Sequence, residues 1–149
     1  MSLKQQAIVY SLGTSTRSKW EFLDLLLNNS IEMVVDVRRF PTSKFEHFNK
    51  DQLSKLLVKA GINYSYLGEA LGGYRSRGYQ SFTITEEFKR GLHQLEKIAQ
   101  QKRVAIVCAE RFPWRCHRRF ISLELERRGW RVVHIIDSKR SWLPRRKSN

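Results

Sequence analysis

Short apolar runs alternate along the chain with segments whose apolar residues recur every three or four positions. The runs are rich in β-branched residues, as buried strands are. They predict strands over 7–12, 33–37, 62–67, 104–108 and 130–136. The segments between them predict helices from Thr16 or Ser18 to Leu27, over 51–60, from Thr85 to about Ala99, and over about 116–128.

This alternation is typical of a mostly parallel sheet with helices on both faces. We therefore predict a single Rossmann-like three-layer α/β domain whose sheet has about five strands. No internal repeat and no Gly/Ser-rich linker divides the 149 residues, so we expect one domain over 1–138 and a basic tail over 139–149. In that tail, Trp142 either stacks on a nucleic-acid base or anchors the tail on the domain.

The length of the apolar runs also indicates whether the chain is expected to cross a membrane. None reaches the roughly 18 residues that a membrane-spanning helix needs. The segment 1–6 leads into only a short apolar run and lacks the features of a signal peptide. We expect a cytoplasmic protein without a membrane partner, and nothing in the pattern indicates an oligomeric state.

The net positive charge of the chain indicates which class of partner it attracts. The chain has 28 Lys and Arg against 14 Asp and Glu, a formal net charge of +14. From Arg103 onward there are 13 basic and 4 acidic residues, so +9 of the total lies in the last third. Such a field attracts polyanions, either nucleic acid or a phosphorylated small molecule. The alternative is that the charge only aids solubility.

Polar residues gather where the predicted strands end, and in parallel sheets ligands bind beyond the carboxyl ends of the strands. A long glycine-rich loop over 68–81 adds to them, since such loops are often functional. The candidates for catalysis are Asp36, Glu110, Cys116 and His117. The candidates for binding an anion or substrate are Gly13, Ser15, Arg38, Gly72, Gly73, Arg115 and Arg118.

Each catalytic candidate has two interpretations. Cys116 at the start of a helix is either a thiolate nucleophile beside a bound anion or a small packed side chain. His117 acts as acid or base, or bonds a backbone carbonyl. Glu110 is a general base, or neutralises nearby arginines. Asp36 interrupts a buried strand and needs a partner, for which Arg38 is one candidate; it serves either the site or the structure.

The two cysteines limit the chemistry further. Cys108 ends a buried strand and is expected to pack as a structural residue, and both cysteines are expected as free thiols in a reducing compartment. Arg115 follows Cys108 one position too late for a C-x5-R phosphatase loop. Two cysteines beside His117 do not make a zinc pattern, and the common nucleotide-binding motifs are absent. We expect neither a metal nor a cofactor.

Several short motifs follow one another in a characteristic order. They are Leu12-Gly13-Thr14-Ser15-Thr16, Val35-Asp36-Val37-Arg38 with Pro41, Leu71-Gly72-Gly73, Cys108-Ala109-Glu110 with Pro113, Cys116-His117-Arg118, and His134-Ile135. In this order they resemble the domain of unknown function 488 family over nearly the whole chain. The resemblance implies a small α/β fold with polar motifs at one end, and no established reaction. The family usually has a histidine where this chain has Thr14.

Three functions remain open on the sequence. The first is an enzyme that acts on a phosphate-bearing substrate, either a nucleotide or nucleic acid, at the strand ends. The second is a non-catalytic nucleic-acid-binding domain that uses the last basic helix and the tail. The third is an interaction or regulatory module whose arginines are structural. The first requires Asp36 and Glu110 to converge at one edge of the sheet.

Overall fold

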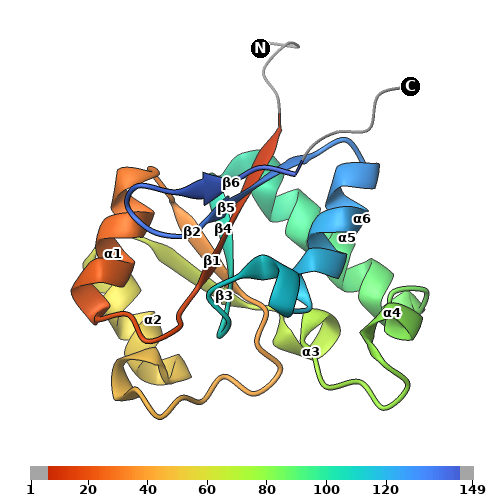
Figure 1. The fold of residues 1–149 in the computed structure, drawn as a ribbon, viewed down its shortest axis with the longest axis horizontal. Helices are drawn as coiled ribbons and strands as arrows, with labels where there is room; N and C mark the ends of the chain where they lie inside the picture. The colour runs from red at the N-terminus through yellow and green to blue at the C-terminus, as the bar shows by residue number, and fades with distance from the viewer. Residues whose placement is uncertain (1–6, 145–149) are drawn as a thin grey trace.

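A mostly parallel sheet of six strands forms the centre of residues 7–144, the part of the chain that the computed structural model describes (Figure 1). The strands are β1 (Ile8–Gly13), β2 (Met33–Asp36), β3 (Asn63–Tyr66), β4 (Val104–Cys108), β5 (Arg131–Ile135) and β6 (Ser141–Trp142). Their order is β3-β2-β4-β1-β5-β6, and only β6 runs antiparallel to its neighbour. The predicted α/β class is confirmed, with one strand more than expected.

Helices cover both faces of this sheet (Figure 1). One face carries α1 (Lys19–Asn28) and α2 (Lys50–Lys59), and the other carries α3 (Gly68–Leu71), α5 (Glu86–Gln101) and α6 (Arg118–Arg127). Shorter elements are α4 (Tyr79–Phe82) and the 3-10 turns η1 (Glu46–Phe48) and η2 (Pro113–Arg115). The cap of α1 is Ser18, whose side chain accepts from the Glu21 N–H at 3.0 Å. Thr85 caps α5 as predicted.

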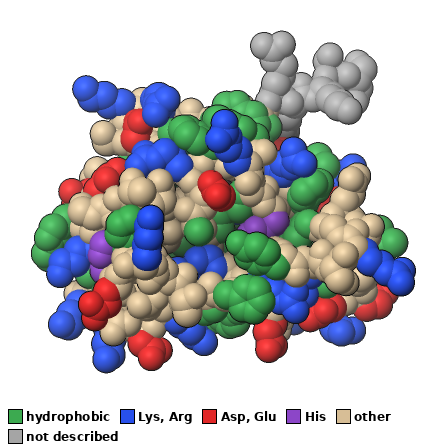
Figure 2. All heavy atoms as spheres, turned by 60° about the horizontal axis from the view of Figure 1, so that its bottom comes forward, with side chains coloured by type: hydrophobic (Ala, Val, Ile, Leu, Met, Phe, Trp, Pro, Cys, Tyr) green, Lys and Arg blue, Asp and Glu red, His purple; other side chains and the backbone are tan. Residues whose placement is uncertain are grey.

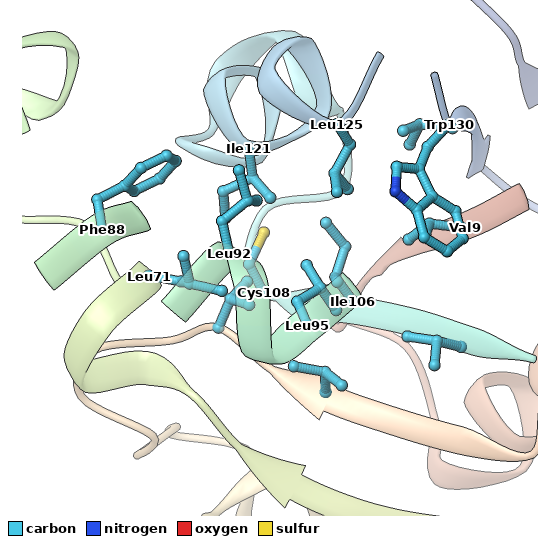
Figure 3. Packing of buried hydrophobic residues seen from close by; sticks show 14 of the residues in the cluster. Val9, Leu71, Phe88, Leu92, Leu95, Ile106, Cys108, Ile121, Leu125 and Trp130 are labelled. Carbon is cyan, nitrogen blue, oxygen red and sulfur yellow. The ribbon is translucent and has the colours of Figure 1, made fainter. Parts of the chain in front are cut away.

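Two hydrophobic clusters, one on each face, hold the layers together. Strand side chains alternate between them because successive residues point to opposite faces. Val35 and Val37 therefore enter the cluster under α5 and α6, whereas Val34 enters the cluster under α1 and α2. Strand β4 is buried along its whole length. Its last residue, Cys108, lies in the first cluster near Leu92 and Ile121 of the covering helices (Figure 3).

Two differences from the sequence prediction bear on the site, and both lie near the strand ends. The helix predicted from Cys116 begins only at Arg118, because Pro113 opens the separate turn η2 and Cys116 is extended, with φ −139° and ψ 155°. The predicted loop over 68–81 contains α3 and the start of α4. Cys116 therefore precedes the first turn of α6 rather than lying in it.

The start of the predicted tail takes part in the sheet. Residues 141–142 pair with β5, and the Trp142 ring stacks on His134 with centroids 5.3 Å apart. Trp114 meets the same indole edge-on at 5.5 Å. These contacts favour the interpretation of Trp142 as an anchor. Residues 145–149 of the tail lie outside the described residues, so the division of the chain near 138 stays a prediction.

Candidate active site

The polar motifs meet at the carboxyl edge of the sheet, which faces the viewer in Figure 2. Asp36 lies in register with Val107, and Gly13 lies in register with Cys108. The loops beyond these strands are joined by backbone bonds, since the Ser15 N–H donates to the Ala109 carbonyl at 2.8 Å. Asp36 therefore ends β2 and Glu110 follows the neighbouring strand β4, so the two lie at one edge of the sheet, as predicted.

A cavity of about 490 Å³ opens at this edge between the loop after β2, the loop after α3 and the segment after β4. Its lining is Arg38, Arg39, Phe40, Thr42, Gly73, Tyr74, Tyr79, Cys108, Ala109, Glu110, Arg115, Cys116 and His117. Six of the eleven candidate residues are among them. A larger hollow of about 710 Å³ lies at the opposite edge, and its described lining includes neither cysteine nor histidine.

Among the lining residues that were not candidates on the sequence are Arg39, Phe40, Tyr74 and Tyr79. Phe40 and Tyr74 are 60% and 84% exposed and contact each other with ring centroids 5.8 Å apart. Arg39 donates to the Tyr74 carbonyl at 2.7 Å and so ties the two loops together. The available signal was their position directly after a strand end or within the glycine-rich loop, although Tyr79 also packs against the core below α5 and α6.

Cys116 and His117 form a hydrogen-bonded pair inside the cavity. The Cys116 Sγ lies 3.5 Å from His117 Nδ1, and His117 Nε2 lies 2.9 Å from the Val37 carbonyl oxygen. Because a carbonyl only accepts, Nε2 carries the proton and donates it, and Nδ1 is left to exchange a proton with the thiol. The ring also packs on Tyr79 with centroids 5.2 Å apart. A Cβ at Gly73 would lie 3.3 Å from Nδ1, so glycine keeps this space open.

The two cysteine sulfurs are also in contact, at 2.7 Å. The hydrogen bond from Cys108 lowers the pKa of Cys116 to about 3, with help from the bond to His117 and against the effect of burial. Burial and the same contact raise the pKa of Cys108. These opposite shifts favour the thiolate form of Cys116 and the thiol form of Cys108, with Cys108 as the donor in the contact. The Arg118 N–H also points at the Cys116 Sγ, at 3.4 Å.

Arg118 is fully buried and lies behind the cavity wall rather than in it. Its Nη1 donates to Ser11 Oγ at 2.9 Å and its Nη2 donates to the Glu110 carbonyl at 2.6 Å. Ser11 in turn bonds the His134 ring. The guanidinium thus fastens the segment after β4 to β1 and α6, which does not fit the predicted contact with an anion. Burial, and then the charge of Arg118, lower the pKa of His134 to about 3.

Asp36 is also bound by neighbouring side chains. Its carboxylate accepts from Arg38 Nε at 2.9 Å, Arg38 Nη2 at 2.8 Å and the Tyr64 hydroxyl at 2.6 Å, so the predicted pairing with Arg38 is confirmed. Burial and the neighbouring carboxylate raise the pKa of Tyr64. Asp36 is 0% exposed, and alternation along β2 turns it toward the face of α1 and α2. Cys108 and Cys116 pack against the opposite cluster, so Asp36 does not share their cavity.

The remaining candidates shape the loops instead of lining the cavity. A Cβ at Gly13 would overlap the Glu110 carbonyl oxygen, so glycine lets the two loops approach closely. Ser15 accepts from the Arg111 side chain at 3.3 Å. A Cβ at Gly72 would overlap neighbouring backbone. The described residues contain no cluster of three or more side chains that could hold a metal ion. Within the same residues, no helix is both long and apolar enough to cross a membrane.

Comparison with known proteins identifies the family of this chain. The model of the family described as Domain of unknown function DUF488 matches residues 19–125, from the start of α1 into α6. The chain belongs to the DUF488 family. The matched region contains Cys108, Glu110, Cys116 and His117, whereas Gly13 and Ser15 precede it. Searches of curated proteins and of solved structures gave no match.

Proposed function

We propose that this protein is an enzyme that acts on a phosphate-bearing substrate, a nucleotide or nucleic acid, with Cys116 as its nucleophile. One observation carries the proposal: the sulfur of a cavity-lining cysteine lies within hydrogen-bonding distance of a histidine whose other nitrogen is fixed by a carbonyl. A nucleophilic cysteine paired with an oriented histidine is the arrangement that covalent catalysis uses. A merely structural cysteine requires neither the histidine nor the cavity.

The anion is assigned to the side chains at the mouth of the cavity. Arg115 is exposed, lines the cavity and makes no side-chain hydrogen bond within residues 7–144. Arg39 lines the opposite side. Guanidinium groups suit phosphate oxygens because they donate in a planar fork. The first N–H of α6, by contrast, is occupied by the Cys116 sulfur, so the helix terminus stabilises the thiolate instead of a substrate anion.

The reaction then proceeds in two steps. The Cys116 Sγ bonds to the electrophilic atom of the substrate while the bond from that atom to the leaving group breaks. His117 transfers to the leaving group the proton that Nδ1 took from the thiol. Water next attacks the same atom, the bond to Sγ breaks, and the proton of water returns to Nδ1. Glu110 lies exposed in the lining, where its carboxylate can hold that water.

Alkylation of Cys116 tests the binding half of this proposal. Inorganic phosphate or adenosine monophosphate should slow the reaction of Cys116 with iodoacetamide at pH 7. Arg115→Ala should weaken this protection, whereas Arg90→Ala, an exposed control on α5 outside the cavity, should leave it intact. Absence of protection by both anions, or equal loss in both variants, contradicts an anion site at the cavity mouth.

Turnover tests the chemical half. Wild-type protein is incubated with a panel of nucleotides and oligonucleotides, and released product is measured. Cys116→Ser should bind adenosine monophosphate with unchanged affinity and release no product. A Cys116→Ser variant that retains the wild-type rate contradicts the assignment of the nucleophile. Glu110→Gln separates the steps, because it should slow release from the enzyme while leaving formation of the covalent adduct.

A second function, nucleic-acid binding without catalysis, is favoured by the aromatic surface beside β6. Trp114 and Trp142 are 46% and 42% exposed, and Phe112 stacks on Trp114 at 5.1 Å. Exposed Lys139 and Arg140 directly precede β6, and lysine and arginine side chains are spread over the face shown in Figure 2. Rings among basic side chains suit stacking on single-stranded bases. Gel shifts should show affinity that falls steeply with salt and weakens in Trp114→Ala. Absence of retention on heparin at about 0.1 M salt contradicts it.

A further inference from the structure

We infer that Cys108 and Cys116 are a redox-active dithiol, in which a hydroperoxide oxidises Cys116 and Cys108 then closes a disulfide with it. This goes beyond the proposed function, because it concerns the reaction of the protein with an oxidant and not with its substrate. It rests on the contact between the two sulfurs and on the different access that each of them has.

The contact places the sulfurs ready for bonding. Their separation is 2.7 Å, and the disulfide bond length of roughly 2.05 Å requires a further approach of well under 1 Å. Cys108 is fixed at the end of the central strand β4, among Leu92 and Ile121 (Figure 3). Cys116 lies in the extended link between η2 and α6, where its N–H donates to the Pro113 carbonyl at 3.2 Å and its carbonyl accepts from the Arg119 N–H at 3.1 Å. The short approach therefore falls to the Cys116 side chain, while the strand stays in place.

The difference in access assigns the order of events. Both cysteines belong to the lining of the cavity, but Cys108 is only 1% exposed, whereas Cys116 is half-buried. A small oxidant in the cavity therefore meets the Cys116 thiolate. Redox-sensitive cysteines characteristically combine thiolate character, access and a second cysteine that resolves the oxidised sulfur. Cys108 fits the second role because its sulfur already contacts the Cys116 sulfur.

The two steps balance as follows. The Cys116 thiolate attacks one peroxide oxygen, an S–O bond forms, the O–O bond breaks, and the departing oxygen takes a proton from solvent to leave as water or an alcohol. Cys116 is then a sulfenic acid. The Cys108 sulfur attacks it, the S–S bond forms, the S–O bond breaks, and the hydroxyl leaves as water with the Cys108 proton. Two electrons pass from the cysteines to the peroxide, and a thiol reductant restores the pair by exchange.

Oxidation with limiting hydrogen peroxide tests this order on the full chain. Intact mass and peptide mapping under non-reducing conditions should show a Cys108–Cys116 disulfide in the wild type, reversed by dithiothreitol. Cys108→Ser should instead accumulate sulfenic acid at Cys116, trapped with dimedone. Cys116→Ser should slow peroxide consumption at least about tenfold, because the remaining thiol is buried and protonated. The two variants are matched controls, since each keeps one sulfur.

Two results overturn the inference. One is over-oxidation of Cys116 in wild-type protein while Cys108 stays fully reactive after denaturation. The other is no change in either cysteine at peroxide levels that oxidise a free thiol. The wild-type measurement stands alone if a variant fails to fold. Fast alkylation of Cys116 without formation of a disulfide refutes this inference and leaves the proposed enzyme intact. Formation of the disulfide without turnover of any phosphate compound supports this inference and contradicts the proposed enzyme.

Discussion

Lowering the pH from 8 to 5 should leave the alkylation rate of Cys116 nearly unchanged. Iodoacetamide reacts with the thiolate, and the contacts to Cys108 and His117 lower the pKa of Cys116 to about 3. The thiolate fraction therefore stays near one across this range. A free thiol with a pKa of about 8.5 loses thiolate roughly 800-fold between the same two pH values.

The shape of the profile is more informative than the absolute rate. A thiolate of low pKa is also a weaker nucleophile, with a Brønsted coefficient of about 0.4–0.5, so Cys116 at pH 8 can react more slowly than a free thiol. A flat profile is still expected, because the intrinsic reactivity does not change with pH. Replacing His117 by Asn removes the hydrogen bond from Nδ1, and the rate should then begin to fall at a higher pH.

Peptide mass spectrometry measures the labelled fraction of Cys116 at fixed ionic strength over this pH range. A short peptide with one cysteine in the same tube is the matched control, and near-ultraviolet circular dichroism checks that the protein stays folded. A Cys116 rate that falls about tenfold per pH unit, in parallel with the peptide, refutes the thiolate. It would remove the chemical basis of the nucleophile, although the cavity and its arginines would remain.

Three further predictions concern stability in urea. Burial and the neighbouring guanidinium lower the pKa of His134 to about 3, so the stability due to its neutral ring is present above about pH 6.5 and is lost as the pH falls. The free energy of unfolding should therefore be about 2 kcal/mol lower at pH 5 than at pH 7. His134→Gln should remove that difference. Tyr64→Phe should cost about 1.5–3 kcal/mol by taking a donor from buried Asp36, and an altered Cys116 alkylation rate would contradict its place on the other face. Trp142→Ala should lower the free energy of unfolding by about 1 kcal/mol through lost ring contacts. Unchanged stability would mean that β6 does not contribute to the stability of the fold.

Periodicity was sufficient to predict the layers and the edge at which the motifs meet. Strand and helix patterns depend on local spacing, and the carboxyl ends of parallel strands share an edge whatever the order of the strands. Strand β6 escaped prediction because two residues carry no period. The start of α6 was placed too early because apolar spacing continues through Cys116, while Pro113 forms a turn of its own.

The roles of individual side chains depended on tertiary contacts that no local pattern contains. Arg118 follows Cys116 closely and appeared suited to an anion, yet its guanidinium is used by Ser11 and a backbone carbonyl. Asp36 lies at the correct edge but on the other face of the sheet. The contact between Cys108 and Cys116 depends on the path of the intervening turn, which sequence spacing does not determine.

The strand order has a consequence for synthesis on the ribosome. Among the strands of residues 7–144, β1 pairs only with β4 and β5, so it has none of these partners until residue 104 has left the exit tunnel. Before that point β2 has only β3 beside it. About the first hundred residues of the nascent chain must therefore remain without the central sheet. When β4 emerges, it pairs with β2 on one side and with β1 on the other, and both pairings span large sequence separations. Cys108 is the last residue of β4, so we expect the contact between the two cysteine sulfurs to form only after β4 has joined the sheet.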